Sequence, residues 1–187
     1  MSWIQYVTLM LKRRGYELDV SSGCITPDDE YVTATMDPYN EGCVNHRQHQ
    51  HDYVGGGRVL VYFVKYIKVS IDIIKSVVTL STHKLRDITH IIIIHSKSLT
   101  SDAKSAIAVN KVFVFETFTF EELSYDLIDI VPPHSLVKSA SSADKPKEWT
   151  KFPIILASDI VSRYYGFKRG DIVRIEEDGI VSYRRCV

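Results

Sequence analysis

Four consecutive isoleucines, Ile91 to Ile94, occupy the centre of the stretch THIIIIHS at residues 89–96. A run that is apolar and β-branched at every position is typical of a strand buried on both faces of a sheet. The run is much shorter than the roughly 20 apolar residues that a transmembrane helix needs. The stretch therefore predicts a central strand in the core of an α/β domain.

The segments around this strand alternate between strand and helix patterns. Residues 59–66 and 111–118 are rich in β-branched and aromatic side chains, as strands are. Residues 70–82 place apolar side chains at helical spacing, and residues 98–109 begin with capping Ser and Thr residues. The motif TFEELS at residues 119–124 has the spacing of a capping box and predicts one helical turn. This order predicts an α/β sandwich with a central sheet flanked by helices.

The beginning of the chain predicts one helix and then little regular structure. Residues 2–14 place aromatic and aliphatic side chains at helical spacing, and Gly15 can end that helix. Residues 16–58 contain prolines, aspartates and a Gly-rich stretch, so we expect a long irregular region with only a short strand at residues 31–35. The N-terminal domain is placed at residues 1–126.

The remaining residues, 127–187, predict a small α+β module. Residues 128–137 resemble a strand that is ended by two prolines, and a polar, Ser-rich stretch follows. A short helix is expected with Ser158 or Asp159 as its N-cap. Gly166 lies where a helix end favours a left-handed residue.

The module ends in a predicted β-hairpin. Its strands are expected at residues 171–175 and 180–185, joined by a turn at Asp178-Gly179. Gly170 lies in the preceding turn, at a position that favours positive φ. An edge strand of this hairpin could pair with a strand of a partner protein.

The charges and cysteines limit the classes of function. The chain has 23 Lys and Arg residues and 23 Asp and Glu residues, so no overall basic field attracts nucleic acid. Any contact with DNA must be local or imposed by a partner. Cys24, Cys43 and Cys186 are widely spaced and form no CxxC pair, which indicates reduced thiols in a cytosolic or nuclear compartment.

The C-terminal module carries a series of short motifs that occur together in one protein family. They are Val131-Pro132 with His134, Phe152-Pro153, Asp159-Ile160, Arg163-Tyr164-Tyr165-Gly166, Lys168-Arg169-Gly170 and Tyr183-Arg184. In this order they resemble the C-terminal assembly module of the fifth subunit of eukaryotic DNA-directed RNA polymerases, a module that is also found in archaeal RNA polymerases. Five features depart from the family: Phe152 stands where leucine is usual, Ile160 stands where proline is usual, Ile128 replaces a histidine, the EEDG loop is shorter, and a Ser-rich stretch replaces a leucine-rich helix.

The resemblance extends over residues 3–187. MLKRRGY resembles the end of the family's first helix, and SLTSDAK resembles a second family motif, with Ser101 where proline is usual. A shortened, divergent copy of this kind fits a large DNA virus or a fast-evolving cellular lineage.

The resemblance implies a non-catalytic structural subunit without a cofactor or a bound metal. The C-terminal module would dock on the largest polymerase subunit, among the other polymerase subunits. The N-terminal domain would form a jaw near downstream double-stranded DNA, with weak contacts to the backbone only. No membrane association and no homo-oligomer are expected. A cellular copy would be in the nucleus, and a viral copy in the viral factory or the virion.

The resemblance assigns two sets of site residues, and none of them is expected to be catalytic. The partner-interface set is Val131, Pro132, His134, Pro153, Asp159, Arg163, Tyr164, Tyr165, Gly166, Lys168, Arg169, Gly170, Tyr183 and Arg184. The DNA-proximal set is Lys97, Thr100, Ser101 and Lys104. Aromatic and Arg side chains are favoured interface anchors, and Lys side chains can meet phosphates.

Two loop motifs are rival candidate sites. Cys43, His46, His49 and His51 are possible zinc ligands, but their spacing matches no common zinc finger, which favours a solvated loop. The stretch VGGGR at residues 54–58 precedes a strand, whereas phosphate-binding glycines follow a strand and open a helix. A flexible hinge is therefore the expected role of these glycines.

Two alternative functions stay open from the sequence. The first is a free-standing α/β enzyme of the nuclease type, although the carboxylates are scattered and no recognised catalytic signature is present. The second is a regulator that uses the module to dock on a host polymerase.

Overall fold

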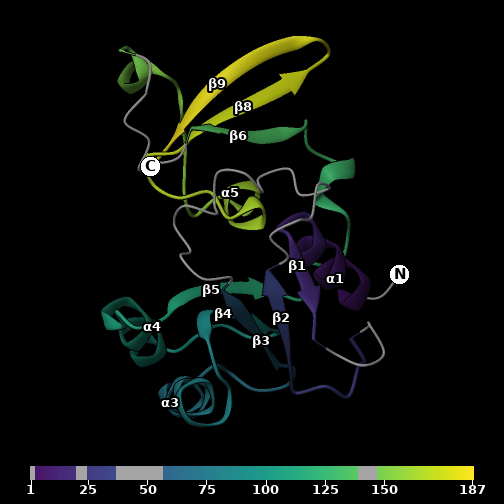
Figure 1. Ribbon diagram of the computed structural model, residues 1–187, viewed down its shortest axis with the longest axis vertical. Coiled ribbons are helices and arrows are strands. Elements are labelled where there is room, and N and C mark those ends of the chain that lie inside the picture. Colours follow the sequence, from purple (N-terminus) through teal and green to yellow (C-terminus); the bar gives the residue numbers. More distant parts are fainter. Residues whose placement is uncertain (1–2, 20–24, 37–56, 139–146) are drawn as a thin grey trace. The chain divides into compact units, whose positions relative to one another are not determined.

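The computed structural model describes residues 3–19, 25–36, 57–138 and 147–187 (Figure 1). The α-helices are α1 (Trp3–Arg13), α3 (Ile71–Thr79), α4 (Ser101–Val109) and α5 (Ile160–Tyr165). The strands are β1 (Tyr16–Leu18), β2 (Tyr31–Met36), β3 (Arg58–Val64), β4 (Ile88–His95), β5 (Val114–Thr119), β6 (His134–Lys138), β7 (Ile154–Ile155), β8 (Ile172–Glu177) and β9 (Ile180–Cys186). Three short helical turns complete the set: η1 (Leu80–Lys84), η2 (Leu127–Asp129) and η3 (Trp149–Lys151).

The described residues form two compact units. The first contains residues 3–9, 16–19, 25–36 and 57–125, and the second contains residues 10–15, 126–138 and 147–187. The first turns of helix α1 therefore belong to the first unit, and its last turn belongs to the second. The division into domains 1–126 and 127–187 stays a prediction, because a domain must also fold independently.

The first unit is built on a five-stranded sheet in the order β1-β2-β3-β4-β5. Strands β1, β2 and β3 pair antiparallel, and β3, β4 and β5 pair parallel. The four isoleucines Ile91 to Ile94 lie in β4 and are fully buried. This burial of every side chain on both faces confirms the predicted central strand.

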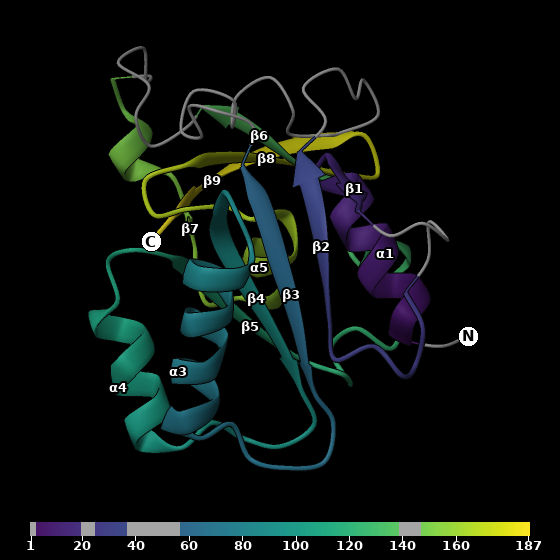
Figure 2. The same ribbon diagram turned by 60° about the horizontal axis from the view of Figure 1, so that its bottom comes forward.

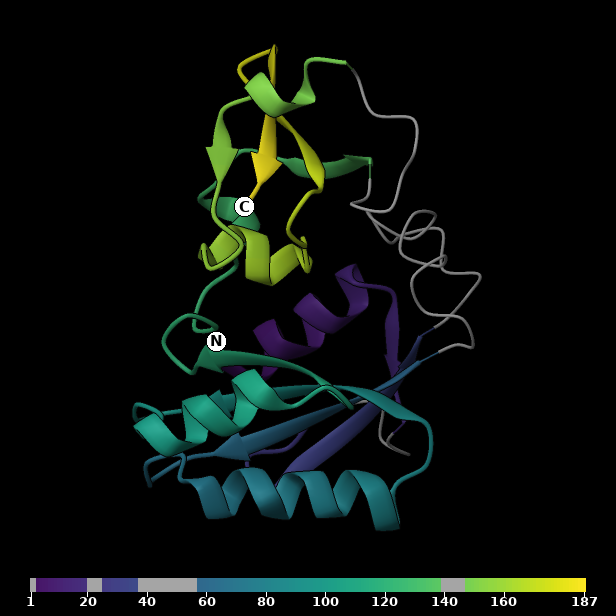
Figure 3. The same ribbon diagram turned by 90° about the vertical axis from the view of Figure 1, so that its left-hand side faces the viewer.

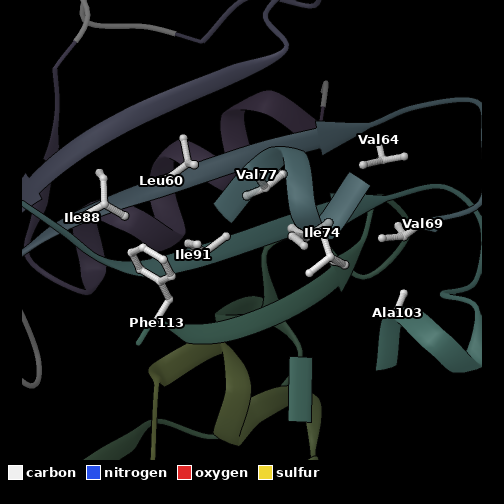
Figure 4. Packing of buried hydrophobic residues seen from close by; sticks show 10 residues of the cluster. Leu60, Val64, Val69, Ile74, Val77, Ile88, Ile91, Ala103 and Phe113 are labelled. Carbon is white, nitrogen blue, oxygen red and sulfur yellow. The ribbon is translucent and has the colours of Figure 1, made fainter. Parts of the chain in front are cut away.

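Helices cover both faces of this sheet, as predicted. Helices α3 and α4 lie side by side on one face (Figure 2), over a buried cluster that includes Leu60, Ile74 and Ile91 (Figure 4). The N-terminal part of α1 lies on the opposite face, seen edge-on in Figure 3. Its Trp3 ring contacts Phe63 of β3 at a centroid distance of 5.1 Å. The predicted mixed α/β fold of this part is confirmed.

The second unit is built on a four-stranded sheet in the order β6-β8-β9-β7, with helix α5. Strands β8 and β9 form the predicted terminal hairpin, which Figure 1 shows with β8 between β9 and β6. Asp178 and Gly179 both have positive φ, 49° and 78°, as a two-residue type I′ turn requires. The hairpin turn and the α+β class of the module are therefore confirmed.

Three local predictions are corrected by the structure. The region expected to be irregular contains β1, which pairs with β2 through Tyr16 and Met36. The segment 128–137 is not one strand, because β6 begins only at His134, after the two prolines. Residues 120–123 form a turn without a helix after the end of β5, although Thr119 and Glu122 make both reciprocal bonds of a capping box.

No helix among the described residues is long and apolar enough to cross a membrane.

Candidate functional site

Helix α5 is the centre of the module, and its ends follow from its sequence. The carboxylate of Asp159 accepts a hydrogen bond from the N–H of Val161 at 2.8 Å, which caps the first turn. Gly166 has a φ of 73°, and the N–H groups of Gly166 and Phe167 donate to the carbonyls of Arg163 and Ser162. This is a Schellman ending, in which glycine adopts the left-handed conformation without strain. The predicted cap Asp159 and the predicted end at Gly166 are confirmed.

Arg14 supplies a second cap to the same helix end. Its Nε donates to the carbonyl of Tyr164 at 2.9 Å, and its Nη2 donates to the carbonyl of Arg163. Both carbonyls belong to the last turn of α5, where helix acceptors lack partners and the helix dipole favours a positive charge. A residue near the N-terminus of the chain therefore completes a helix of the C-terminal module.

Arg13 makes the charged contacts beside this cap. Its guanidinium donates to both carboxylate oxygens of Asp126, at 2.5 and 2.9 Å, and to the hydroxyl of Tyr164 at 2.7 Å. These hydrogen bonds lower the pKa of the Asp126 carboxyl. Burial raises the pKa of the Tyr164 hydroxyl. The three side chains form a bidentate, mostly buried cluster that fixes α5 against the residues at the start of the module.

The predicted partner-interface residues differ widely in exposure. His134, Tyr164 and Tyr165 are buried, while Val131, Pro132, Arg163, Gly166, Lys168 and Gly170 are partly buried. Pro153, Asp159, Arg169, Tyr183 and Arg184 are exposed. The assignment of all these residues to an interface stays a prediction. The exposed and the partly buried members have surface that a partner can touch without a rearrangement of the module, whereas the three buried members have almost none.

Two buried members of the set belong to an aromatic stack. The rings of Tyr165 and Phe167 lie 5.3 Å apart and almost parallel, and the ring of His134 stacks on Tyr165 at a centroid distance of 6.1 Å. Nδ1 of His134 lies 2.5 Å from the carbonyl oxygen of Pro132. The stack links the start of β6 to α5 and gives this part of the module an internal, structural role.

The burial of His134 predicts that the stability of the chain falls in mild acid. Burial lowers the pKa of the imidazole below its ordinary value of 6.5. The unfolded chain therefore takes up this proton first, so the stabilising effect is complete above about pH 6.5 and is lost as the pH falls towards the lower folded pKa. Urea unfolding at pH 7.5 and pH 5.5 is expected to reveal this loss, and His134→Gln should reduce it. The matched control is His83→Gln, which replaces an exposed histidine, and the loss of stability in acid should persist in this variant.

The outer half of the terminal hairpin is exposed on both faces. Every residue from Ile180 to Arg184 is exposed, and the exposed fraction of Ile180 reaches 73%. Nearer the base of the hairpin, Tyr183 stacks on Phe152 with ring centroids 5.9 Å apart. Apolar side chains that stay in water on a small module mark a candidate surface for protein association.

The DNA-proximal residues lie around the start of α4. Lys97 is exposed in the turn after β4, and Ser101 and Lys104 are exposed on α4. Thr100 is the N-cap, and its hydroxyl oxygen accepts from the N–H of Ala103 at 3.2 Å. The structure brings these four residues together on one loop and helix start. Their proximity to DNA stays a prediction.

Two features were missed from the sequence. The first is the structural role of Arg13 and Arg14, whose only signal was a basic pair before a glycine at a helix end. The second is a contact on the sheet of the first unit, where His90 Nε2 lies 3.2 Å from a carboxylate oxygen of Glu116, without hydrogen-bond alignment. Both side chains are mostly buried. Because they come from neighbouring strands far apart in the sequence, only the strand order reveals the pair.

The rival loop sites lie outside the described residues. This applies to Cys43, His46, His49 and His51, and to most of the VGGGR stretch. Within residues 3–19, 25–36, 57–138 and 147–187, no group of three or more His, Cys, Asp or Glu side chains could hold a metal ion.

Comparisons with known proteins give a consistent result. Residues 130–186 match the family model described as RNA polymerase Rpb5, C-terminal domain. The chain is 32% identical over 144 residues to the DNA-directed RNA polymerases I, II, and III subunit rpabc1 of Dictyostelium discoideum, which covers 69% of this chain and 72% of that protein. It is 26% identical over 196 residues to DNA-directed RNA polymerase subunit 5-like protein 1 of Arabidopsis thaliana, with coverage of 94% and 87%.

A viral protein is also similar. Uncharacterized protein 028R of Frog virus 3 (isolate Goorha) is 40% identical over 87 residues, which covers 46% of this chain and 52% of that protein. The match thus spans about half the length of the viral relative.

Proposed function

The chain belongs to the Rpb5 family of DNA-directed RNA polymerase subunits, and we propose from this premise that it is a non-catalytic structural subunit of a multi-subunit RNA polymerase. The observation that carries the proposal is the exposed hairpin, which lies within the part of the chain that matches the family model. A surface of this kind suits association with a larger partner.

The C-terminal module is the part that docks, and its partner is the largest polymerase subunit. Five of the predicted interface residues are exposed on this module, and two of them, Arg169 and Arg184, are arginines, a residue type favoured at interfaces. Tyr183 adds an exposed aromatic side chain on the hairpin. The buried residues of the predicted set act indirectly, because they stabilise the arrangement of α5 and the sheet to which the partner binds.

The N-terminal domain lies near downstream DNA in this proposal. Lys97 lies in the turn after β4 and Lys104 lies on α4, and both side chains are exposed. Both ammonium groups can therefore reach DNA phosphates. Such contacts carry no sequence information. The balanced charge of the chain supports only a weak contact, which depends on assembly into the polymerase.

The proposed non-catalytic role agrees with the burial of His90 and Glu116, two side chains of a type that can act in acid–base catalysis. Their side chains are only 5% and 18% exposed, which limits their access to a substrate. A cellular copy would act in the nucleus. A viral copy, which the similarity to a frog virus protein favours, would act in the viral factory or the virion.

Purification of the tagged chain from its native source tests this proposal. We expect it to elute with two very large polymerase subunits in a ratio near one to one, because a structural subunit is a stoichiometric component. Elution as a lone species of 21.4 kDa would contradict the proposal. Capture of polymerase in much less than equal amounts, with polymerase that is complete without the chain, would instead favour a docking regulator.

A further inference from the structure

The main-chain groups of β9 alternate between two directions. In a two-residue hairpin the pair that flanks the turn, here Glu177 and Ile180, exchanges hydrogen bonds, and the pattern alternates from there. The N–H of Cys186 donates to the carbonyl of Asp171 at 2.9 Å, which follows the same alternation. The even-numbered residues of β9 therefore turn their main-chain groups towards β8. The odd-numbered residues turn theirs towards the outer edge of the sheet.

Strand β7 occupies only the base of this outer edge. The N–H of Arg185 donates to the carbonyl of Pro153 at 2.8 Å, where the chain enters β7. Strand β7 has two residues, so its pairing ends there. Among the described residues, the outward N–H and C=O groups of Val181 and Tyr183 have no hydrogen-bond partner. Within the part of the chain that the structure describes, the outer half of β9 is thus a strand edge without a pairing strand.

The side chains along this edge determine which side chains a partner strand needs in order to bind. Val181 and Tyr183 share one face of the hairpin and are each 40% exposed, and Ile180 on the other face is 73% exposed. The tip of the hairpin is acidic, with Glu177 and Asp178 both exposed. An extended strand with apolar side chains at alternate positions and a basic residue at the end nearest the tip would complement these features.

We propose that the edge of β9 at Val181 and Tyr183 accepts an extended strand of the largest polymerase subunit, which continues the sheet beyond β7. This inference rests on the proposed function and adds the mode of recognition. Main-chain hydrogen bonds from Val181 and Tyr183 provide the binding, and the apolar side chains and acidic tip select the strand. The pairing also covers an edge that would otherwise promote aggregation of the free chain.

The variant Val181→Pro tests the main-chain contact. Proline removes the outward N–H, which has no acceptor among the residues that the structure describes, and proline is tolerated at the edge of a sheet. The free variant is therefore expected to unfold thermally as the wild type does. In the full chain, expressed with a tag in the native source, the amount of polymerase retained per chain is expected to fall roughly 10- to 100-fold, because a partner carbonyl loses its donor inside an interface.

The matched control is Val181→Ala, which keeps the N–H and shortens the side chain. It should retain polymerase much better than Val181→Pro. Hydrogen exchange gives an independent readout, because the amides of Val181 and Tyr183 should exchange quickly in the free chain and slowly in the complex.

Each outcome of these experiments is decisive. If Val181→Pro retains polymerase as the wild type does, the strand edge is not the docking site, although the proposed function stands. If the wild-type chain captures no polymerase subunit, the proposed function itself fails. If the wild-type chain forms dimers that Val181→Pro abolishes without any effect on polymerase capture, the edge binds a second copy of the chain and our assignment is wrong.

Discussion

Replacing Arg13 with alanine is expected to lower the free energy of unfolding of the second unit by about 3 kcal/mol, near the low end of what is found when one partner of a buried ion pair is removed. Arg13 holds both oxygens of Asp126 and the hydroxyl of Tyr164. The side chains of Arg13 and Asp126 are only 22% and 13% exposed. Without the guanidinium, the Asp126 carboxylate stays largely buried and unpaired, which costs more than the loss of a surface ion pair.

Urea unfolding followed by far-ultraviolet circular dichroism measures this effect. The matched control is Lys12→Ala, since Lys12 is the neighbouring basic residue on α1 and is exposed, so its removal should change stability by less than about 0.5 kcal/mol. Arg13→Lys should recover only part of the loss, because an ammonium group cannot make the bidentate contact. A double-mutant cycle with Asp126→Asn should reveal strong coupling. Equal stabilities of Arg13→Ala and Lys12→Ala would refute the structural role of Arg13.

Replacing Ile91 with alanine is expected to lower the free energy of unfolding of the first unit by about 2–5 kcal/mol, the range for large-to-small changes in a packed core. Ile91 is fully buried in β4, within the cluster between the sheet and helices α3 and α4 (Figure 4). Because β4 lies between β3 and β5, the cavity would be in the centre of the parallel part of the sheet. Such a site has little freedom to collapse around the missing atoms.

The matched control for Ile91 is Ile67→Ala. Ile67 follows β3 and is 60% exposed, so the same truncation there should change stability by less than about 0.5 kcal/mol. Chemical denaturation of both variants provides the measurement. A loss below about 1 kcal/mol in Ile91→Ala would contradict the packing described for this strand.

The sequence predicted best those elements whose signals are local. The Ile91–Ile94 run fixed the central strand because four β-branched apolar residues in a row need burial on both faces. Asp178-Gly179 fixed the hairpin because both residues tolerate positive φ. Asp159 and Gly166 fixed the ends of α5 through capping and left-handed backbone geometry. In each case a few neighbouring residues determine the structure.

Elements that depend on distant partners were missed. Strand β1 has three residues, and only its pairing with β2 makes it a strand. The roles of Arg13 and Arg14 depend on residues more than 100 positions away, to which no pattern in the sequence connects them. The role of Tyr164 as an interface anchor was suggested by its residue type and stays a prediction. The hydrogen bond of its hydroxyl with Arg13 inside the module had no signal in the sequence.

The second unit contains two segments of the chain that the ribosome makes at different times. The unit combines residues 10–15 with residues from 126 onwards, and the Arg13–Asp126 and Arg14–Tyr164 contacts join positions 113 and 150 residues apart. The ribosome adds roughly 5–20 residues per second, so the tip of α1 is made many seconds before its partners. The last turn of α1 therefore cannot make its contact with α5 until α5 has been translated. An interrupted translation product that ends before α5 would therefore lack the carbonyl groups to which Arg14 donates.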